Sequence, residues 1–512
     1  MDCNAIKYFS TNAGIFGTPD LKAGISSGEI QTFGLAEATF RGQAPDGGLM
    51  MPIHLPRFGL EEIMQMKGMI YSQVFVETMM PYYHEVLRRQ TMERIGEAYT
   101  FKPFMENISK NDIIARLDEG PSASFKDFAA QAKFRIDEAL IGEEPLSEIE
   151  YRRQLGKIPL ITYVVATSGD TGSAMGLACH NKNKQMMVII HSSRIPEKIT
   201  EMQAKQMSSI GDNIYVVRVD TDFDGCARIA NELQRDPELN YMHINSANSV
   251  NIGRLLPQRS YYYDIYSKVA EKGEVVYFSV PSGNFGNATA GLMAMREGLP
   301  IKLIIAVNEN DVFERFYRTG IYAPAESSHT STSSAIEVNW PSNVRRLFQY
   351  YGGQLVEGKD PDDETRKVIS KLVLPNLRQL RQEIACYSVS DTESDERIQS
   401  FWKEGHIINY MRNGIPRRVQ STIEPHGAVA VDAGQKFRAE TGYDGKIVYL
   451  ETAHSGKFPE RIRAMGIEPD LPEGLAKLVD QPHGGFYTAG NNYTEVKGLV
   501  KMLREQELRR VA

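Results

Sequence analysis

A lysine followed by an aspartate stands at the start of a predicted helix in EGPSASFKDFAAQAKF, residues 119–134. Gly120 and Pro121 predict a turn, so Lys126 lies near the N-terminus of the helical run that follows. The positive end of the helix dipole disfavours an added cation and lowers the affinity of this lysine for a proton. Schiff-base chemistry needs such a neutral amine. Lys126 is therefore a candidate nucleophile, with a solvated surface lysine as the alternative, and Asp127 is expected to cap or pair locally.

Two glycine-containing loops each follow an apolar run and precede a helical one. In ATSGDTGSAMGLA (166–178), Ser168 and Thr171 supply hydroxyls and the helix supplies free N–H groups, a cradle for a carboxylate or phosphate. This loop has neither a Walker ending nor the usual dinucleotide fingerprint. In VPSGNFGNATAG (280–291), backbone amides can hold a phosphate without a lysine. An ordinary strand-to-helix turn is the alternative for each loop.

A third segment, INSANSVNIGRLLPQ (244–258), carries polar side chains at three-residue intervals. Asn248, Asn251 and Arg254 would share one face of a helix or helical turn. A guanidinium with two amides suits a small dianion. A polar helix face without a ligand is the alternative.

A fourth segment, ETAHSGKF (451–458), follows the predicted strand KIVYL. Thr452 comes where that strand ends, and a hydroxyl there can hydrogen-bond a pyridine nitrogen without forcing its protonation. His454 and Lys457 are candidates for substrate contacts, and a structural histidine is the alternative for His454.

Short runs rich in Ile, Val and Thr alternate with helical runs along most of the chain and would position these loops. The predicted strands cover residues 158–168, 185–193, 213–220, 274–283, 301–310 and 445–453. This alternation predicts an α/β fold with a largely parallel sheet and helices on both faces. Ligands of such sheets bind beyond the C-terminal ends of the strands, where the four segments fall.

Composition restricts the class of protein. Of 512 residues, 42% are hydrophobic and 24% charged, and the net charge is -7, which argues against a nucleic-acid-binding surface. None of the four cysteines forms a C-x-x-C pair or has a histidine at metal-ligand spacing, so no metal site is expected. The sequence shows no signal peptide and no membrane-spanning run, which predicts a cytoplasmic protein.

Taken together, the segments resemble threonine synthases of the type found in enteric bacteria and yeast. The motifs SFKDF, TSGDTGSA, NSANSVNIGRLL, PSGNFGN and TAHSGKF occur in that order, and APDGGLMMP, VNENDVFERFYRTG, PSNVRRL and EPHGAVA extend the match along nearly the whole chain. The resemblance implies a fold type II pyridoxal-phosphate enzyme, similar to the tryptophan synthase β subunit. Two three-layer α/β domains and an N-terminal cap would enclose pyridoxal 5'-phosphate.

The resemblance also implies domains and site residues. The N-terminal domain would span residues 1–105, the small domain with the cofactor lysine 106–275, and the large domain 276–512, with a helical insertion at about 360–420. Lys126 would form the Schiff base. The other cofactor contacts would be Gly283, Asn284, Phe285, Gly286, Asn287 and Thr452. Substrate contacts would be Ser168, Asp170, Thr171, Asn248, Asn251 and Arg254.

The implied reaction converts O-phospho-L-homoserine and water to L-threonine and phosphate by β,γ-elimination and replacement. The partner would be a small phosphorylated amino acid, and the protein a monomer or homodimer. A phospho-lyase of the same fold, or a specialised-metabolism paralogue using another phosphorylated amino acid, is the nearest alternative. A cysteine-synthase-like enzyme would not need the Asn248–Arg254 cluster, and a binding protein without catalysis would not need Lys126.

Overall fold

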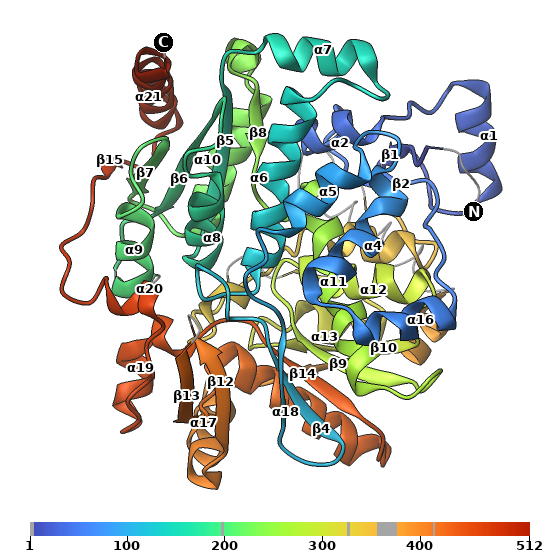
Figure 1. The fold of residues 1–512 in the computed structure, drawn as a ribbon, viewed down its shortest axis with the longest axis vertical. Helices are drawn as coiled ribbons and strands as arrows, with labels where there is room; N and C mark the ends of the chain where they lie inside the picture. Colours follow the sequence, from blue (N-terminus) through green and yellow to red (C-terminus); the bar gives the residue numbers. More distant parts are fainter. Residues whose placement is uncertain (1–4, 196–198, 325–327, 356–375, 413–414, 512) are drawn as a thin grey trace.

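Two largely parallel β-sheets form the framework of the computed structural model, which describes residues 5–195, 199–324, 328–355, 376–412 and 415–511. The five-stranded sheet is wholly parallel, in the order β15 (Tyr487–Ala489), β7 (Ile214–Val219), β6 (Gln185–Ser192), β5 (Ile161–Thr167) and β8 (Ile244–Ser246). It lies at the upper left in Figure 1.

The six-stranded sheet lies below and to the right of the first in Figure 1. Its order is β11 (Ile384–Ser388), β10 (Ile301–Val307), β9 (Val276–Pro281), β14 (Ile447–Glu451), β4 (Asp112–Arg116) and β3 (Phe104–Asn107). Only β3 runs antiparallel to its neighbour. All six strands predicted from the sequence are present, and the predicted α/β class is confirmed.

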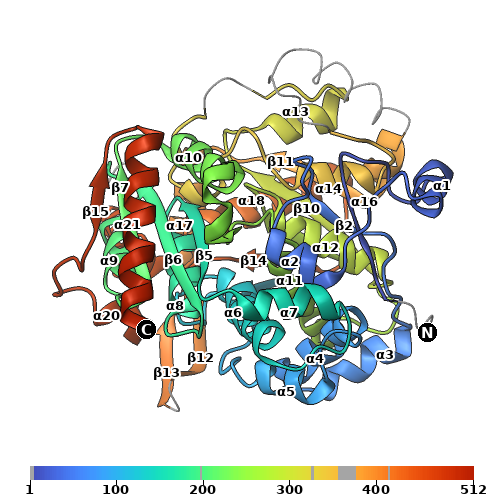
Figure 2. The same ribbon diagram turned by 90° about the horizontal axis from the view of Figure 1, so that it is seen from above.

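Helices cover both faces of the five-stranded sheet. Alternate strand residues face opposite sides, so Val164 and Val188 belong to one hydrophobic cluster and Val165 and Ile189 to another. The first cluster includes α10 (Phe223–Arg235) and α21 (Tyr493–Val511). The second includes α6 (Lys126–Gly142), α8 (Asp170–Cys179) and α9 (Glu201–Ser208). Figure 2 shows α21 alongside β6 and β7 at the outer side of the sheet.

The six-stranded sheet is layered in the same way. Phe278 and Leu303 point to the side covered by α11 (Ile252–Val269) and α12 (Gly286–Arg296), and Ile304 and Tyr449 point to the side covered by α17 (Asp391–Glu404) and α18 (Pro425–Thr441). Each sheet is therefore the middle layer of a three-layer unit. The helix α11 packs against α6 as well as α12, and so connects the two units.

The N-terminal segment packs on α11 through a buried ionic network. Arg259 and Glu297 form a fully buried ion pair, to which Tyr263 adds a hydroxyl donor at 2.9 Å and Thr78 a carbonyl acceptor at 2.9 Å. Both charges need these partners because an unpaired buried charge is strongly destabilising. The segment contains β1 (Tyr8–Ser10), α1 (Pro19–Ser27), α2 (Leu35–Arg41), β2 (Met50–Pro52), α3 (Leu60–Gln65), η1 (Met66–Gly68), α4 (Tyr71–Tyr83) and α5 (Arg89–Gly96).

The chain passes from one sheet to the other at positions that differ from the predicted domain boundaries. Although β3 and β4 begin near residue 105, they belong to the large sheet, and β15 and α21 near the C-terminus belong to the small one. The predicted division into 106–275 and 276–512 does not hold for these elements. Pairing between strands hundreds of residues apart leaves no local signal in the sequence, which explains the difference.

The predicted helical insertion at about 360–420 is wrong for part of its length. The segment contains α16 (Leu377–Glu383) and α17, but β11 is an edge strand of the large sheet, and β12 (Ile407–Arg412) pairs with β13 (Ile415–Gln420) as an antiparallel hairpin. A five-residue apolar run such as β11 cannot be told from a helix by periodicity. Residues 356–375 of this prediction lie outside the described residues.

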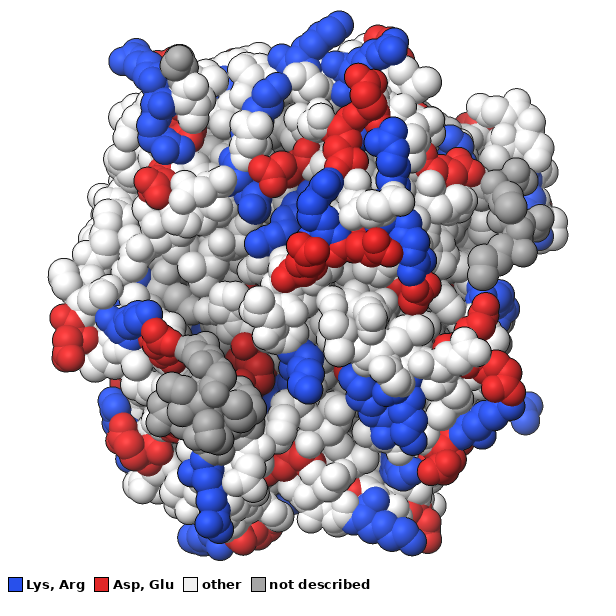
Figure 3. Space-filling model, in the orientation of Figure 1, with Lys and Arg blue, Asp and Glu red and all other residues white. Residues whose placement is uncertain are grey.

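Shorter elements complete the fold: α7 (Ile149–Lys157), η2 (Pro237–Met242), α13 (Val312–Thr319), η3 (Ser334–Ile336), α14 (Val344–Gln349), η5 (Ser455–Lys457), α19 (Pro459–Ala464) and α20 (Glu473–Ala476). Within the described residues, no helix is long and apolar enough to cross a membrane. On the face shown in Figure 3, Lys and Arg side chains are interspersed with Asp and Glu.

Candidate active site

The loops after β5, β9 and β14 line one cavity between the two sheets. Twelve of the thirteen predicted site residues line it: Lys126, Ser168, Asp170, Thr171, Asn248, Arg254, Gly283, Asn284, Phe285, Gly286, Asn287 and Thr452. The remaining one, Asn251, does not. The cavity thus occupies the place that parallel α/β sheets use for ligands, beyond the carboxyl ends of their strands.

Lys126 is the first residue of α6, as predicted. The segment before it is bonded to the end of β14: Phe125 N–H donates to Thr452 O at 2.8 Å, and Ser124 pairs with Ala453. The Asp127 carboxylate accepts from Ser122 N–H at 2.8 Å, which is the local pairing expected of it. These bonds fix the start of the helix and therefore the direction in which the lysine leaves it.

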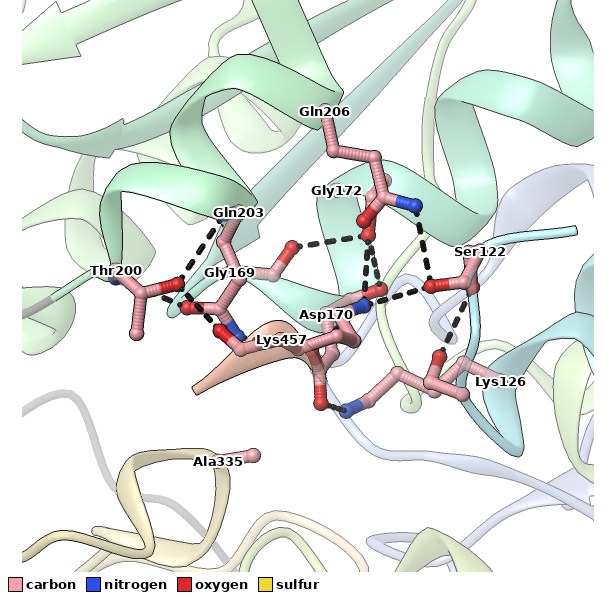
Figure 4. Close-up of polar contacts among 12 residues, drawn as sticks. Ser122, Lys126, Gly169, Asp170, Gly172, Thr200, Gln203, Gln206, Ala335 and Lys457 are labelled. Carbon is pink, nitrogen blue, oxygen red and sulfur yellow. Dashed lines mark hydrogen bonds and ion pairs between the residues drawn. The ribbon is translucent and has the colours of Figure 1, made fainter. Parts of the chain in front are cut away.

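The Asp170 carboxylate contacts two lysines (Figure 4). Its Oδ2 lies 3.5 Å from Lys126 Nζ, and its Oδ1 lies 2.8 Å from Lys457 Nζ and accepts from Gln203 Nε2 at 2.9 Å. Burial alone would raise the pKa of Asp170, but the neighbouring lysines, Lys457 more than Lys126, hold that pKa well below its usual range. Asp170 is therefore ionised.

Lys126 is shielded from water, with 11% of its side chain exposed. Burial lowers the pKa of its amine; the Asp170 carboxylate opposes this shift, while the positive charges of Lys457 and Arg254 add to it. The net result is a lowered pKa, so a larger fraction of this amine is neutral than in an ordinary lysine. The sequence predicted this property from the helix dipole, whereas burial is the largest cause in the structure.

The loop after β5 is shaped by a hydroxyl that sequence reasoning missed. The buried Thr167 Oγ1 accepts from the N–H groups of Gly169 and Gly172, both at 2.9 Å. Gly169 has φ +126°, and a Cβ there would collide with the Gln203 amide. The first turn of α8, with Asp170 and Thr171, is thereby held at the wall of the cavity.

The loop after β9 ends at the N-terminus of α12. A Cβ at Gly283 would lie 2.7 Å from Ile336 Cα, so only glycine fits, and Phe285 adopts a left-handed φ of 58° to start the helix. The buried Asn287 side chain accepts from the hydroxyls of Tyr261 and Tyr262, at 2.6 and 2.7 Å. Its Nδ2 has no hydrogen-bond partner among the described residues. An oriented amide donor at a helix N-terminus is suited to an anion.

The predicted cluster of Asn248, Asn251 and Arg254 is divided. Asn251 is the N-cap of α11: its Oδ1 accepts from Gly253 N–H at 2.9 Å, and its Nδ2 donates to Thr39 O at 2.9 Å. Its side chain is fully buried and its amide is hydrogen-bonded to the protein, so the structure gives it a structural role, and its predicted contact with substrate stays a prediction. Helical spacing alone does not distinguish a capping amide from a ligand-binding one.

Asn248 and Arg254 do line the cavity. The Asn248 amide makes two bonds to the backbone of Ala166, which joins its turn to the end of β5. Arg254 is 3% exposed, donates to Ala247 O at 2.9 Å, and leaves its Nε without a partner among the described residues. Burial lowers the pKa of its guanidinium to about 10, so it stays charged near neutral pH. A buried cation of this kind is suited to an incoming anion.

His426 also lines the cavity and was not predicted. Ala335 N–H donates to its Nε2 at 3.0 Å, so Nδ1 carries the proton and donates to the Glu424 carboxylate. Of the two candidate substrate contacts after β14, His454 Nδ1 accepts from Gly456 N–H at 3.0 Å, and Lys457 is fully buried against Asp170. Neither lines the cavity.

The chain matches models of known protein families over most of its length. Residues 110–452 match the family described as pyridoxal-phosphate dependent enzyme, residues 26–99 the threonine synthase N terminus, and residues 427–500 the threonine synthase C-terminal region. The threonine synthase of Haemophilus influenzae is 30% identical over 452 residues, covering 86% of this chain and 91% of its own. The Escherichia coli threonine synthase is also 30% identical over 452 residues, covering 87% and 92%.

Solved structures agree with these relatives. The pyridoxal-phosphate-bound threonine synthase from Brucella melitensis superimposes with a TM-score of 0.79 at 27% identity, over 98% of this chain and 99% of that one. Threonine synthase from yeast gives a TM-score of 0.76 at 25% identity, over 99% of both chains.

Thr167→Val tests the role of the missed hydroxyl. It leaves the N–H groups of Gly169 and Gly172 without their acceptor, so we expect a loss of about 1–3 kcal/mol in the free energy of unfolding, measured by urea titration. Thr162→Val, on the same strand, is the matched control, because the buried Thr162 hydroxyl has no partner among the described residues. Equal losses in the two variants would contradict the assignment.

Proposed function

This chain belongs to the threonine synthase family of pyridoxal-phosphate-dependent enzymes, and on that premise we propose that it converts O-phospho-L-homoserine and water to L-threonine and phosphate. The feature that most directly supports this reaction is a pair of separate anion-binding groups in one cavity with Lys126. One is the N-terminus of α12 with Asn287; the other is Arg254 with Asn248. Cofactor and substrate each carry one phosphate, which matches the two groups.

The residues present fit pyridoxal phosphate. The first turn of α12 and the unpartnered Asn287 Nδ2 offer donors for its phosphate, and Gly283 leaves room where a Cβ would meet Ile336. Lys126 supplies an amine with a lowered pKa for its aldehyde. Thr452 supplies a hydroxyl in the same cavity that would hydrogen-bond the ring nitrogen.

Bound pyridoxal phosphate supplies an electron sink that stabilises negative charge on the substrate carbons. The chain must then move protons, and Lys126 Nζ is the atom we assign to remove the proton from the substrate Cα. Its lowered pKa favours the neutral form that accepts a proton, and Asp170 at 3.5 Å stabilises the ammonium that results. Because Lys126 is 11% exposed, few water molecules can compete for that proton.

Arg254 and Asn248 would hold the phosphate of the substrate. Since Arg254 is buried without an acidic partner among the described residues, a phosphate dianion would provide the counter-charge that the guanidinium lacks. The same contact would stabilise the phosphate as it leaves, which is when its negative charge is greatest. Asn248 would be oriented for this contact by its two bonds to Ala166.

The first turn of α8 would bind the substrate carboxylate. Ser168 and Thr171 bring hydroxyls to the cavity, and Thr167 holds the N–H groups on either side of Asp170 and Thr171. A helix N-terminus with neighbouring hydroxyls favours a carboxylate. The substrate would therefore be held at both of its charged ends.

Product identification tests the proposed reaction. Incubation of the holoenzyme with O-phospho-L-homoserine should release L-threonine and phosphate in equal amounts. Lys126→Ala should reduce turnover by at least about 10²–10⁴-fold, because it removes the proton-transferring amine. Accumulation of 2-oxobutyrate in place of threonine would contradict the proposal and favour a phospho-lyase, as would turnover of O-phosphothreonine but not of O-phospho-L-homoserine.

Arg254→Met tests the substrate-phosphate site. Removing a buried partner of a charged group typically costs 2–5 kcal/mol, so we expect kcat/KM for O-phospho-L-homoserine to fall by about 30-fold or more. Competitive inhibition by inorganic phosphate should weaken in parallel. Arg135→Met is the control, because Arg135 bonds to Gln131 on its own helix and does not line the cavity. Unchanged phosphate inhibition in Arg254→Met would place the substrate phosphate elsewhere.

A further inference from the structure

Lys457 is a second buried lysine at the site, and it has more polar partners than Lys126. Its side chain is 0% exposed, and its Nζ lies 2.8 Å from Asp170 Oδ1, 2.9 Å from Ser122 O and 3.4 Å from Ser173 Oγ. An ammonium has three N–H donors, and these three acceptors match them. Figure 4 shows the Lys126 and Lys457 side chains converging on Asp170.

Lys126 Nζ has a single polar partner among the described residues, Asp170 Oδ2 at 3.5 Å. Two buried amines thus share one carboxylate, but only Lys457 has acceptors for all its donors. Burying a charged group is costly unless its hydrogen bonds are satisfied. Of the two amines, Lys457 is therefore the one whose ammonium form is fully hydrogen-bonded, and its positive charge acts on Lys126.

The other charged groups near Lys126 come from several elements. Arg254 on α11 is positive and acts in the same direction as Lys457, whereas Asp170 on α8 acts in the opposite direction. His426 and Glu337 line the same cavity. His426 donates to Glu424 and accepts from Ala335 N–H. Glu337 accepts from Ser331 N–H at 3.2 Å.

Lys457 also connects the parts of the site. Its ammonium bonds to Ser122 O in the segment that leads into Lys126, and its own carbonyl accepts from Thr200 Oγ1 at 2.8 Å, just before α9. Gln203 on α9 donates to the same carboxylate oxygen of Asp170 as Lys457 does. The residue therefore has two separable effects: a mechanical one through hydrogen bonds, and an electrostatic one through its charge.

We propose that Lys457 is a positioning residue whose permanent charge holds the Asp170 carboxylate in place and leaves Lys126 as the neutral, reactive amine of the pair. This inference rests on the proposed role of Lys126 as the cofactor-binding lysine. Without the charge of Lys457, the Asp170 carboxylate would act on Lys126 alone. Lys126 would then hold its proton more tightly and react only at higher pH.

Trace acylation of amines tests the proposal directly. The full-length chain, with pyridoxal phosphate removed, is treated with acetic anhydride at a series of pH values, and peptide mass spectrometry gives the labelling rate of Lys126. Only a deprotonated amine reacts, so the midpoint of the profile reports the ionisation of Lys126. Four variants are compared with the parent: Lys457→Met, Lys457→Gln, Lys457→Arg and the control Lys268→Met, which removes a lysine paired with the buried Asp264 near the far end of α11.

Lys457→Met and Lys457→Gln should each move the Lys126 midpoint upward by about one pH unit or more, as expected when a charge a few ångströms away is removed. Lys457→Arg keeps the charge and should stay close to the parent, as should Lys268→Met. If Lys457→Met fails to fold, Lys457→Gln decides, because its amide can still donate to Ser122 O. Unchanged midpoints in the neutral variants would overturn the proposal, and so would an equal shift in Lys457→Arg.

The labelling involves neither cofactor nor substrate, so its outcome is independent of the reaction catalysed. A shifted midpoint in a chain that makes no threonine would support the role of Lys457 and refute only the proposed function. A chain that makes threonine with an unshifted midpoint in the neutral variants would refute only the role of Lys457.

Discussion

The active site depends on one buried carboxylate, that of Asp170, which contacts two lysines from opposite parts of the chain. A carboxylate in this position is stable only because cations and an amide surround it. Its charge in turn decides how the two amines share protons. The two lysines interact through this shared carboxylate. Removing either lysine would therefore change how readily the other gains or loses its proton.

The fold brings these groups together by a simple rule of parallel sheets. Asp170 follows β5 of one sheet, Lys457 follows β14 of the other, and Lys126 starts a helix whose leading segment bonds to the end of β14. Because side chains at the carboxyl ends of parallel strands meet at one edge, loops far apart in sequence line one cavity. The two proposed anion-binding groups lie on different elements: Asn287 is in the first turn of α12, whereas Arg254 is in the first turn of α11 and Asn248 in the turn before it.

Much of this site follows from sequence, because its main features are local. These features are a lysine at the start of a helix, the glycine loops after β5 and β9, and an arginine near the N-terminus of a helix. Each is visible within about a dozen residues of sequence. The structure places all of these in one cavity. The six predicted strands were also identifiable, since each is a short apolar run bounded by turn residues.

The sequence did not reveal two kinds of feature. One is contacts between residues far apart in the chain. The other is the role of a polar side chain, because the spacing of a ligand-binding residue and of a capping residue can be the same. From the sequence, Lys457 was a candidate substrate contact. In the structure it is buried against the carboxylate of Asp170, which lies 287 positions earlier in the chain. Asn251 has the spacing of a ligand but caps α11 and bonds to Thr39 in the N-terminal segment. Likewise, β15 is three residues long and pairs with β7, which lies far from it in the sequence.

Borohydride reduction of the holoenzyme, followed by peptide mass mapping, tests the central claim most directly, namely that Lys126, and not Lys457, is the Asp170-bound amine that binds the cofactor. The reduced adduct should occur on the peptide that contains Lys126 and on no other. An adduct on the Lys457 peptide, or none at all, would contradict the account.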